Sequence, residues 1–318
     1  MGVVTIVGTV ALAVAVVALI ARYVPGVIVP VVATAALAPY LMLGAPLAMI
    51  LLAISGRWIA VAVAGAVTVA TVAAQLPSYT RARVESGVTV RVVSANLRYG
   101  RADPDTVVAM ARDNADIIAV QELTPEKAKL ISAAGIDAAF PYRALRAREG
   151  PAGVGIWSRY PIHSATERDE FWLGLLTARV QIPDVTAEVT IIAAHMSAPW
   201  PDPIRGWRDD LARLTTTLHE IASDTEGPIM VAADLNATRD IREFRMLLRN
   251  GYRDGAEQAG AGLTRTHPAD IFLPPVFAVD HVLTRGCVAT SMRTLDLSGS
   301  DHRALVADVV VPQAATTR

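Results

Sequence analysis

The first 80 residues are almost uniformly apolar, whereas the rest of the chain alternates short apolar runs with polar stretches. A helix needs about 20 apolar residues to span a bilayer, and three stretches approach or exceed that length, at residues 3–22, 27–54 and 58–76. Prolines interrupt the middle stretch, which we interpret as one kinked or tilted span because membrane helices tolerate proline. The pattern therefore predicts a membrane anchor of three transmembrane helices in residues 1–78, followed by a linker over 79–87.

From residue 88 onward, short β-branched runs alternate with helical or loop stretches. Such apolar runs predict buried strands, which we expect at Val88–Ala95, Asp116–Val120, Gly153–Ser158, Val189–Ala194, Pro228–Ala233, Ala278–Leu283 and Ala304–Val311. Helices are expected over Pro104–Asn114, Pro125–Ala134, Arg205–Ser223 and Ile241–Asn250. The alternation predicts one α/β domain over residues 88–312, with a short tail over 313–318.

Charge divides the chain at the same place. Residues 1–80 contain no Lys, Asp or Glu and only two arginines, Arg22 and Arg57. The remainder has 27 Lys and Arg against 30 Asp and Glu, a net charge of −3, which provides no general attraction to nucleic acid or anionic lipid. This balance argues against a protein that coats polyanions. The single cysteine, Cys287, excludes an internal disulfide framework and a cysteine-rich zinc site.

A cleaved signal peptide is the alternative interpretation of the first apolar run. We disfavour it because no Lys or Arg precedes the run and apolar character resumes after Pro25 and Gly26. An odd number of spans would place the amino terminus and the polar domain on opposite faces of the membrane. More arginines flank the spans on the domain's side than on the other side, which favours a cytoplasmic domain, but the difference in their number is small. Long domains also translocate despite flanking charge. The charge pattern therefore leaves the topology open.

Polar side chains stand at the ends of most predicted strands. Some of them follow a predicted strand, some lie within one and some precede one. They are Asn96, Gln121, Glu122, His195, Asp234, Asn236, Asp280, His281, Asp301 and His302. Strand ends at one edge of a sheet bring residues that are distant in sequence into one pocket. A single Asp or Asn in such a place is usually a turn former or a helix cap. The repetition over so many strands indicates a shared site, whereas we expect His163, His219 and His267 to be ordinary surface or core histidines.

The order of these motifs resembles the endonuclease/exonuclease/phosphatase superfamily over roughly residues 88–312. The motifs are Ser-Ala-Asn96-Leu, Val-Gln121-Glu122-Leu, Gly155-Ile-Trp-Ser-Arg159, Ala-His195-Met, Ala-Asp234-Leu-Asn236, Val-Asp280-His281-Val and Ser300-Asp301-His302-Arg303. Each is weak alone, and the ordered set is specific. The resemblance implies an α/β (α+β) four-layer sandwich of two mixed β-sheets flanked by helices. It also implies a hydrolase that cleaves phosphate esters with a divalent metal, usually Mg²⁺, with Mn²⁺ as the alternative.

The resemblance also implies a metal site. Asn96 and Glu122 match the family's metal ligands, and Asp301 is a further candidate; oxygen ligands of this kind suit a hard cation. Three positions depart from the usual pattern. Ala233 stands where many relatives have Gly. Arg98 stands where abasic-site endonucleases have a second acidic residue, which counts against DNA-repair specificity, and His267 stands where many relatives have Trp.

Catalytic roles follow from the same resemblance. Asp234 resembles the residue that positions or deprotonates the attacking water, and Asn236 resembles its phosphate-holding neighbour. His302 resembles the family's essential imidazole, oriented by Asp280 as a carboxylate–histidine pair. His195 resembles the second imidazole, which donates to a phosphoryl oxygen or to the leaving group. The sequence leaves open whether Asp234 or His302 is the base.

Three N-terminal spans together with this domain resemble the actinobacterial membrane proteins of the teicoplanin-resistance (VanJ) type. That resemblance implies an extracytoplasmic catalytic domain and a polyprenyl-diphosphate substrate. We therefore expect a multi-pass protein of the cell membrane, whose partners are the bilayer and a phosphate-containing substrate, with no obligate protein partner. The alternatives are a membrane-anchored nuclease, disfavoured by the net charge and by having only two lysines, Lys127 and Lys129, and a non-catalytic binding module.

Three segments of the polar part are candidates for apolar surface facing the bilayer. Two follow His195 and contain Trp200 and Trp207, and the third is Phe171–Leu176. For Phe171–Leu176 we favour the alternative of a buried strand.

Overall fold

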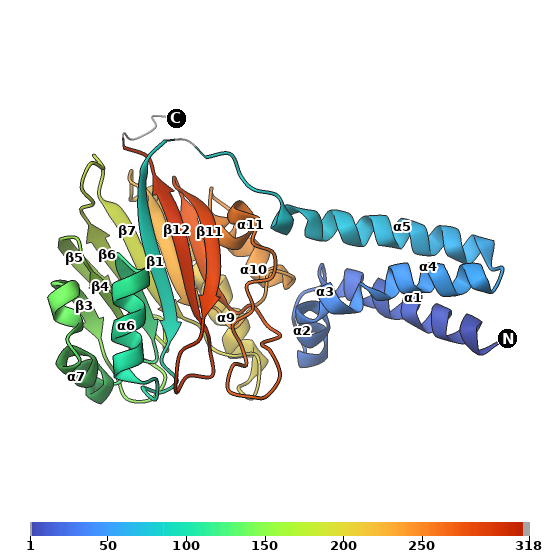
Figure 1. Ribbon diagram of the computed structural model, residues 1–318, viewed down its shortest axis with the longest axis horizontal. Helices are drawn as coiled ribbons and strands as arrows, with labels where there is room; N and C mark the ends of the chain where they lie inside the picture. The colour runs from blue at the N-terminus through green and yellow to red at the C-terminus, as the bar shows by residue number, and fades with distance from the viewer. Residues whose placement is uncertain (1, 85, 314–318) are drawn as a thin grey trace.

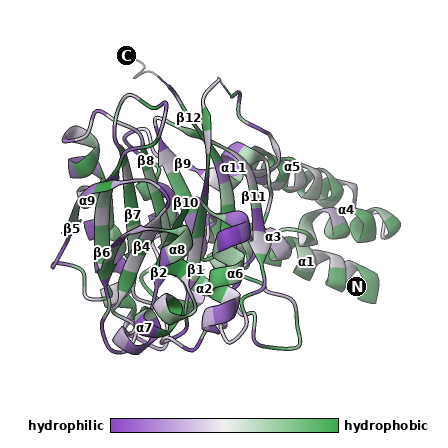
Figure 2. Ribbon diagram, turned by 60° about the vertical axis from the view of Figure 1, so that its left-hand side comes forward, coloured by the Kyte–Doolittle hydropathy of each residue, from purple (hydrophilic) through white to green (hydrophobic). Residues whose placement is uncertain are grey.

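A helical projection joins a domain of two sheets in the computed structural model, which describes residues 2–84 and 86–313 (Figure 1). The projection contains α1 (Val3–Ala21), α2 (Val29–Ala36), α3 (Ala38–Leu41), α4 (Gly44–Ile54), α5 (Trp58–Gln75) and the 3₁₀ turn η1 (Leu76–Tyr79). Apolar residues dominate it, whereas the two-sheet domain mixes polar and apolar positions (Figure 2). Of the predicted tail, residues 314–318 lie outside the described part of the chain.

Two helices of the projection are long and apolar enough to cross a membrane, α1 and the α5–η1 segment. The expectation of one kinked or tilted span over residues 27–54 stays a prediction. That stretch is divided into α2, α3 and α4, with a bend of 60° between Val29–Ala36 and Ala38–Ile54. Proline lacks an N–H and its fixed φ suits the first turn of a helix, and Pro30, Pro39 and Pro46 each lie in the first turn of one of these helices. The projection has three spans only if the bent pair counts as one.

Two six-stranded mixed sheets form the rest of the chain. The first has the order β11-β12-β1-β2-β4-β3 and consists of β1 (Val88–Asn96), β2 (Ile117–Gln121), β3 (Tyr142–Arg146), β4 (Val154–Ser158), β11 (Val288–Leu295) and β12 (Ala304–Val311). The second has the order β5-β6-β7-β8-β10-β9 and consists of β5 (Ile162–Glu167), β6 (Leu175–Val180), β7 (Val189–His195), β8 (Ile229–Asp234), β9 (Arg253–Asp254) and β10 (Asp280–Arg285). Each sheet has one central parallel pair, β1–β2 or β7–β8.

The sheets pack face to face, and helices cover their outer faces (Figure 1). Inward-facing side chains of both sheets, such as Val92 and Ile191, share one apolar core. A second core lies between the first sheet and α6 (Pro104–Asn114), α7 (Pro125–Ala133) and α8 (Ile136–Ala139). A third lies between the second sheet and α9 (Ile204–Ser223) and α10 (Arg242–Leu247), while the short α11 (Gly255–Ala259) contacts β10 and β11. The predicted architecture of two mixed sheets flanked by helices is confirmed.

Two expectations for the tryptophan-containing segments are wrong. Trp207 is fully buried on the inner face of α9, where helical spacing aligns it with Leu211, Leu214 and Leu218, so it is not surface facing a bilayer. The strand favoured over Phe171–Leu176 begins only at Leu175. Trp172 and Trp200 remain exposed.

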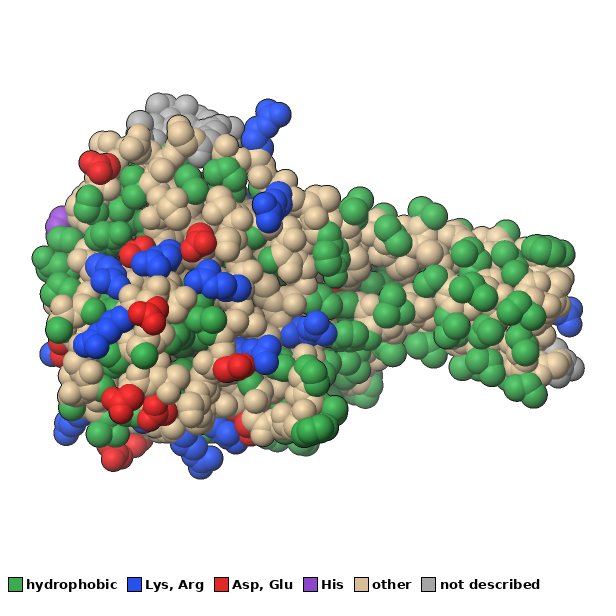
Figure 3. All heavy atoms as spheres, viewed as in Figure 1, with side chains coloured by type: hydrophobic (Ala, Val, Ile, Leu, Met, Phe, Trp, Pro, Cys, Tyr) green, Lys and Arg blue, Asp and Glu red, His purple; other side chains and the backbone are tan. Residues whose placement is uncertain are grey.

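Buried polar contacts fasten the projection to the two-sheet domain. The Arg22 guanidinium at the end of α1 pairs with Asp240, and the two side chains are 4% and 3% exposed. Gln75 Nε2 donates to Asp240 Oδ1 at 2.7 Å, and the Gly26 amide donates to Glu243 Oε1 at 2.8 Å. Charged side chains otherwise gather on the domain, and apolar ones cover the projection (Figure 3). The projection and the domain are therefore held in one orientation.

We expect Arg22→Ala to destabilise the protein by about 3–5 kcal/mol, because the Asp240 carboxylate would stay buried without its cation. Thermal unfolding of the full chain in detergent would measure the loss. Arg293→Ala is the matched control, since Arg293 and Asp308 form an exposed pair 4.0 Å apart, and removing such a pair costs less than about 1 kcal/mol. Equal losses in the two variants would contradict the role assigned to Arg22.

Candidate active site

Strand direction brings the predicted site residues to one edge of the two sheets. The parallel pairs β1–β2 and β7–β8 place Asn96 beside Gln121 and His195 beside Asp234 at their carboxyl ends. The antiparallel strands β10 and β12 begin at the same edge, so Asp280 lies opposite Asp234 and His302 lies two residues before the start of β12. Residues more than 200 positions apart in sequence, Asn96 and His302, therefore share a single site.

Asn96 links two carboxylates at the centre of this site. Its Nδ2 donates to Glu122 Oε1 at 3.0 Å and to Asp234 Oδ2 at 2.9 Å. The Tyr99 amide donates to the other oxygen of Glu122, Oε2, at 2.5 Å. Asn96, Glu122 and Asp234 are all buried, so this side-chain network is rigidly supported.

His195 faces both carboxylates. Its Nε2 lies 3.6 Å from Asp234 Oδ2 and 3.9 Å from Glu122 Oε1. Its Nδ1 lies 3.1 Å from the carbonyl oxygen of Pro151, so Nδ1 carries a hydrogen and donates to that oxygen. This contact fixes the ring with Nε2 turned into the site.

His302 and Asp280 form a buried carboxylate–histidine pair. His302 Nδ1 lies 2.8 Å from Asp280 Oδ2, and His302 Nε2 lies 3.8 Å from Asp234 Oδ2. Burial alone would lower the pKa of His302, but the negative charges of Asp280 and Asp234 outweigh it and raise the pKa to about 10. Burial also disfavours the charged form of Asp280, yet the adjacent imidazolium and its hydrogen bond hold the pKa of that carboxyl below its usual range. The ring is therefore an imidazolium at neutral pH.

His267 belongs to this site, contrary to the expectation that it is an ordinary core or surface residue. Its ring centroid is 4.5 Å from that of His302, and its Nδ1 lies 3.2 Å from the carbonyl oxygen of Asp301. Burial and the positive charge of His302 lower the pKa of His267. A neutral imidazole therefore lies against the charged one. His281, by contrast, contacts the Ala237 carbonyl and the Phe244 ring and is part of the surrounding support.

Asp301 lies on the His302 side of the site. Its carboxylate is 3.7 Å from Arg98 Nε, and Arg98 Nη2 in turn lies 2.7 Å from Asp270 Oδ2. Within the described residues, ligand atoms of Asp301, His267 and His302 lie within 4.8 Å of one another, as do those of Asp234, Asp280 and His302. Asp301 is not grouped with Glu122 in either cluster, so a shared metal site of Asn96, Glu122 and Asp301 stays a prediction.

Backbone strain concentrates in the loops that follow the site strands. Arg98, Tyr99, Glu122 and Asn236 have φ values of 47°, 51°, 57° and 48°, a left-handed region that costs a non-glycine residue about 1–3 kcal/mol. The Asn236 turn is held by its amide, which donates to Asp234 Oδ1 at 3.0 Å, and by its Nδ2, which donates to the Met196 carbonyl at 2.9 Å. Strain of this kind persists only where surrounding contacts impose it, and here it includes the site residue Glu122 and the turn that follows Asp234.

The donor set fits a divalent cation. Glu122 and Asp234 supply two carboxylates that both accept from Asn96 Nδ2. Asn96 Oδ1 accepts from the Arg98 amide at 2.8 Å and keeps one further lone pair. Hard cations such as Mg²⁺ prefer such oxygen ligands, and each of these carboxylates retains lone pairs beyond those used in its hydrogen bonds. Two buried carboxylates this close repel each other, and a cation would relieve that repulsion.

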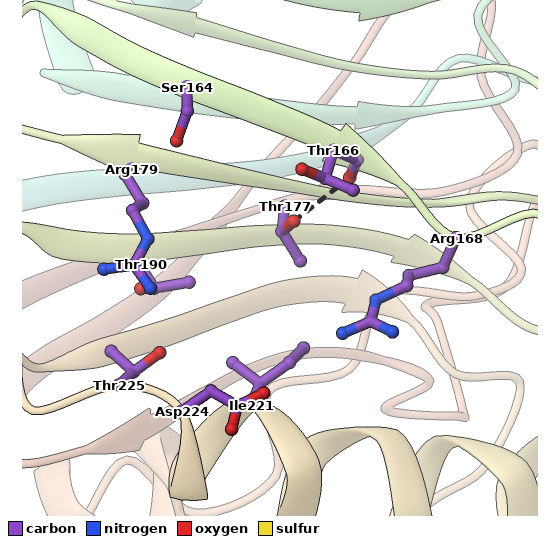
Figure 4. Close-up of a pocket in the computed structure, with 9 residues that line it drawn as sticks. All are labelled: Ser164, Thr166, Arg168, Thr177, Arg179, Thr190, Ile221, Asp224 and Thr225. Carbon is purple, nitrogen blue, oxygen red and sulfur yellow. Dashed lines mark hydrogen bonds between the residues drawn. The ribbon is translucent and has the colours of Figure 1, made fainter.

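A separate hollow of about 170 Å³ lies on the outer face of the second sheet, beside the end of α9 (Figure 4). Arg168, Arg179 and several hydroxyl side chains line it, and none of the predicted catalytic or metal residues does so in the described structure. Arg168 lies 3.9 Å from Glu220, and Arg179 lies 3.8 Å from Glu188. Since these carboxylates partly neutralise both arginines, we assign the hollow no part in the chemistry.

Comparison with known proteins agrees with this geometry. The sequence model of the "Endonuclease/Exonuclease/phosphatase family" matches residues 93–302. An endonuclease/exonuclease/phosphatase from Bacteroides vulgatus is 17% identical with a TM-score of 0.58, covering 70% of this chain and 99% of that one. D. rerio TDP2 in complex with a single-strand DNA product is also 17% identical, with a TM-score of 0.57, covering 70% of this chain and 98% of that one. No curated protein matches the sequence significantly.

The family match spans both parallel strand pairs and every site residue described above, from Asn96 to His302. The solved structures share the two-sheet architecture over nearly their whole length. This chain belongs to the endonuclease/exonuclease/phosphatase family of metal-dependent phosphoesterases and nucleases.

Proposed function

We propose that this chain is a membrane-anchored phosphoesterase that hydrolyses a lipid-linked phosphate ester or diphosphate, such as a polyprenyl diphosphate. The observation that carries this proposal is the attachment of the site domain to two helices of membrane-spanning length and hydropathy through buried contacts. A site fixed beside a bilayer meets lipid-linked phosphates at high effective concentration. The two lysines and net charge of −3 in residues 81–318 offer little attraction to a nucleic-acid backbone.

The charge state of the site favours Asp234 as the general base. In-line attack needs a water held near a group that accepts its proton, with donors around the phosphoryl oxygens. His302 already carries a proton at neutral pH because its pKa is raised to about 10, so it is suited to donate rather than to accept. Asp234 lies between the two imidazoles and is the carboxylate placed to take the proton.

The other site residues complete this assignment. We propose that His195 Nε2 donates to a phosphoryl oxygen or to the leaving group, and that Asn236 holds the phosphate. Asp280 orients His302 and keeps it charged. Asn96 and Glu122 would hold a divalent cation, Mg²⁺ or Mn²⁺, with Asp301 as a further ligand. When bound, the cation would neutralise charge on the phosphoryl oxygens.

A nuclease is the second candidate, because one protein of similar fold, TDP2, was crystallised with a single-strand DNA product. We expect the purified full chain, supplied with Mg²⁺ in vesicles, to release phosphate from a polyprenyl diphosphate and to leave single- and double-stranded DNA intact. Removal of the cation with a chelator should stop the reaction, and fresh Mg²⁺ should restore it. DNA cleavage without phosphate release from the lipid would establish the nuclease instead.

We further propose that the catalytic domain is extracytoplasmic. A fusion of alkaline phosphatase to the C-terminus tests this orientation, since that reporter is active only outside the cytoplasm. An inactive fusion of normal abundance would place the domain inside.

A further inference from the structure

One loop joins the helical projection to the active site. We call residues 269–276, which lie between His267 and β10, the bridging loop. At one end, the Val276 carbonyl accepts a hydrogen bond of 2.7 Å from the Tyr40 hydroxyl of α3. At the other end, the Ala269 amide donates to the Asp301 carbonyl at 2.7 Å, and Asp270 pairs with Arg98 at 2.7 Å. The loop therefore spans the distance between the projection and the site.

The middle of the bridging loop presents uncovered apolar side chains. Ile271, Phe272 and Leu273 are 51%, 102% and 61% exposed. Scattered exposed apolar residues are ordinary, but three in succession beside a polar site indicate a contact surface. Both ends of the loop are tied down, so these side chains are held out by the fold.

Other loops next to site residues also carry exposed apolar side chains. Tyr99, Trp172 and Trp200 are 54%, 66% and 71% exposed. The amide of Tyr99 contacts Glu122. Trp172 lies two residues before Gly174, whose carbonyl accepts a hydrogen bond from the His195 amide. Trp200 lies five residues after His195. Exposed apolar side chains thus occur in three loops next to site residues, in addition to those of the bridging loop.

We propose that the bridging loop holds the apolar chain of a membrane-held lipid phosphate while its head group occupies the active site. The charged end of such a substrate must reach Asp234 and His302, and exposing its apolar chain to water on the way costs free energy. Exposed apolar side chains of the protein lower this cost by covering the chain. On the projection, Val27 and Ile28 are likewise 48% and 54% exposed just before α2. This proposal rests on the proposed function and identifies the route of its substrate.

A labelling experiment tests the contact without relying on activity. Phe272→Cys in the full chain is labelled with a polarity-sensitive dye and placed in vesicles that contain lipids with a quencher on the acyl chain. Cys287 is buried and its thiol pKa is raised to about 12, so the unsubstituted chain serves as the labelling blank. We expect blue-shifted emission and quenching at position 272, and neither at Lys129→Cys, an exposed position on α7.

Val69→Cys on α5 reports on the anchor itself, since Val69 is 69% exposed in that helix. Quenching at position 69 but not at position 272 would overturn the bridging-loop proposal and would support the proposed membrane anchor. Absence of quenching at both positions would overturn the membrane anchor and the loop proposal together. Blue-shifted emission at 272 that depends on protein concentration and is not quenched by lipid would indicate contact with a second copy of the chain and would also overturn the proposal.

Kinetics supply the second measurement. Phe272→Ser combined with Leu273→Ser should lower kcat/KM for a long-chain polyprenyl diphosphate in vesicles by about tenfold or more. The same variant should leave kcat/KM for a short, water-soluble prenyl diphosphate unchanged. Leu130→Ser on α7, an exposed leucine outside the bridging loop, is the matched control and should affect neither substrate. Equal losses on both substrates would contradict a role in holding the chain.

Discussion

Replacing Asp234 by Asn is expected to lower kcat by about 10³- to 10⁴-fold, the upper range for loss of a general base. The Asn side chain has the same shape but a single acceptor oxygen, so it keeps the hydrogen bond from Asn96 only by giving up the one from the Asn236 amide. It cannot accept a proton from water, and it removes the negative charge that lies 3.6 Å from His195 and 3.8 Å from His302. Steady-state turnover of the substrate identified above, at saturating Mg²⁺, would give the ratio of kcat values.

The matched control is Asp308→Asn, because Asp308 lies on β12 away from the site and is partly exposed. Both variants should retain the unfolding temperature of the parent chain within a few degrees. An Asp234→Asn variant that keeps kcat within about tenfold of the parent would refute the assignment of Asp234 as the base.

Replacing Asp280 by Asn is expected to change the pH dependence of catalysis. In the parent chain the pKa of His302 is raised to about 10, so its proton is lost only in strongly alkaline solution and the alkaline limb of kcat/KM should lie there. Without the Asp280 charge, burial of the imidazole weighs more heavily and lowers its pKa. The alkaline limb should then move to lower pH, and at pH 8 the variant should lose about 100-fold in kcat/KM.

Full pH profiles of kcat/KM for the parent, Asp280→Asn and the Asp308→Asn control would test this expectation. A variant that is impaired by the same factor at every pH would show that Asp280 only supports the structure. An unshifted limb would show that Asp280 does not set the charge of His302.

The sequence predicts the central elements well because their patterns are unambiguous. All seven predicted strands and four predicted helices are present, with their ends moved by a few residues. Each residue of the Asn96–Glu122–Asp234–His302–Asp280 network was identifiable because it stands at the end of a buried, uniformly apolar strand, and strand direction then brings such ends together. Five strands were not predicted, the edge strands β3, β5, β9 and β11 and the interior strand β6. The polar residues of the largely exposed β3 and β5 hide the strand pattern.

Other features depend on contacts that are not local in sequence. His267 lies in a loop without strand or helix periodicity, and only its place in the family motif order points to the site. The pairing of Arg98 with Asp270 and Asp301 joins segments about 170 and 200 residues apart. Length and hydropathy do not predict the division of residues 27–54 into three helices, each of which has a proline in its first turn.

The attachments at Arg22, Gly26 and Tyr40 have one more consequence for an enzyme in a bilayer. Three separate points of attachment prevent the catalytic domain from rotating relative to the helical projection. If the helices cross the membrane as proposed, the scissile bond must then be offered at one fixed height above the lipid surface. Such an enzyme would select among phosphorylated lipids by the distance at which their head groups hold the scissile bond from the lipid surface.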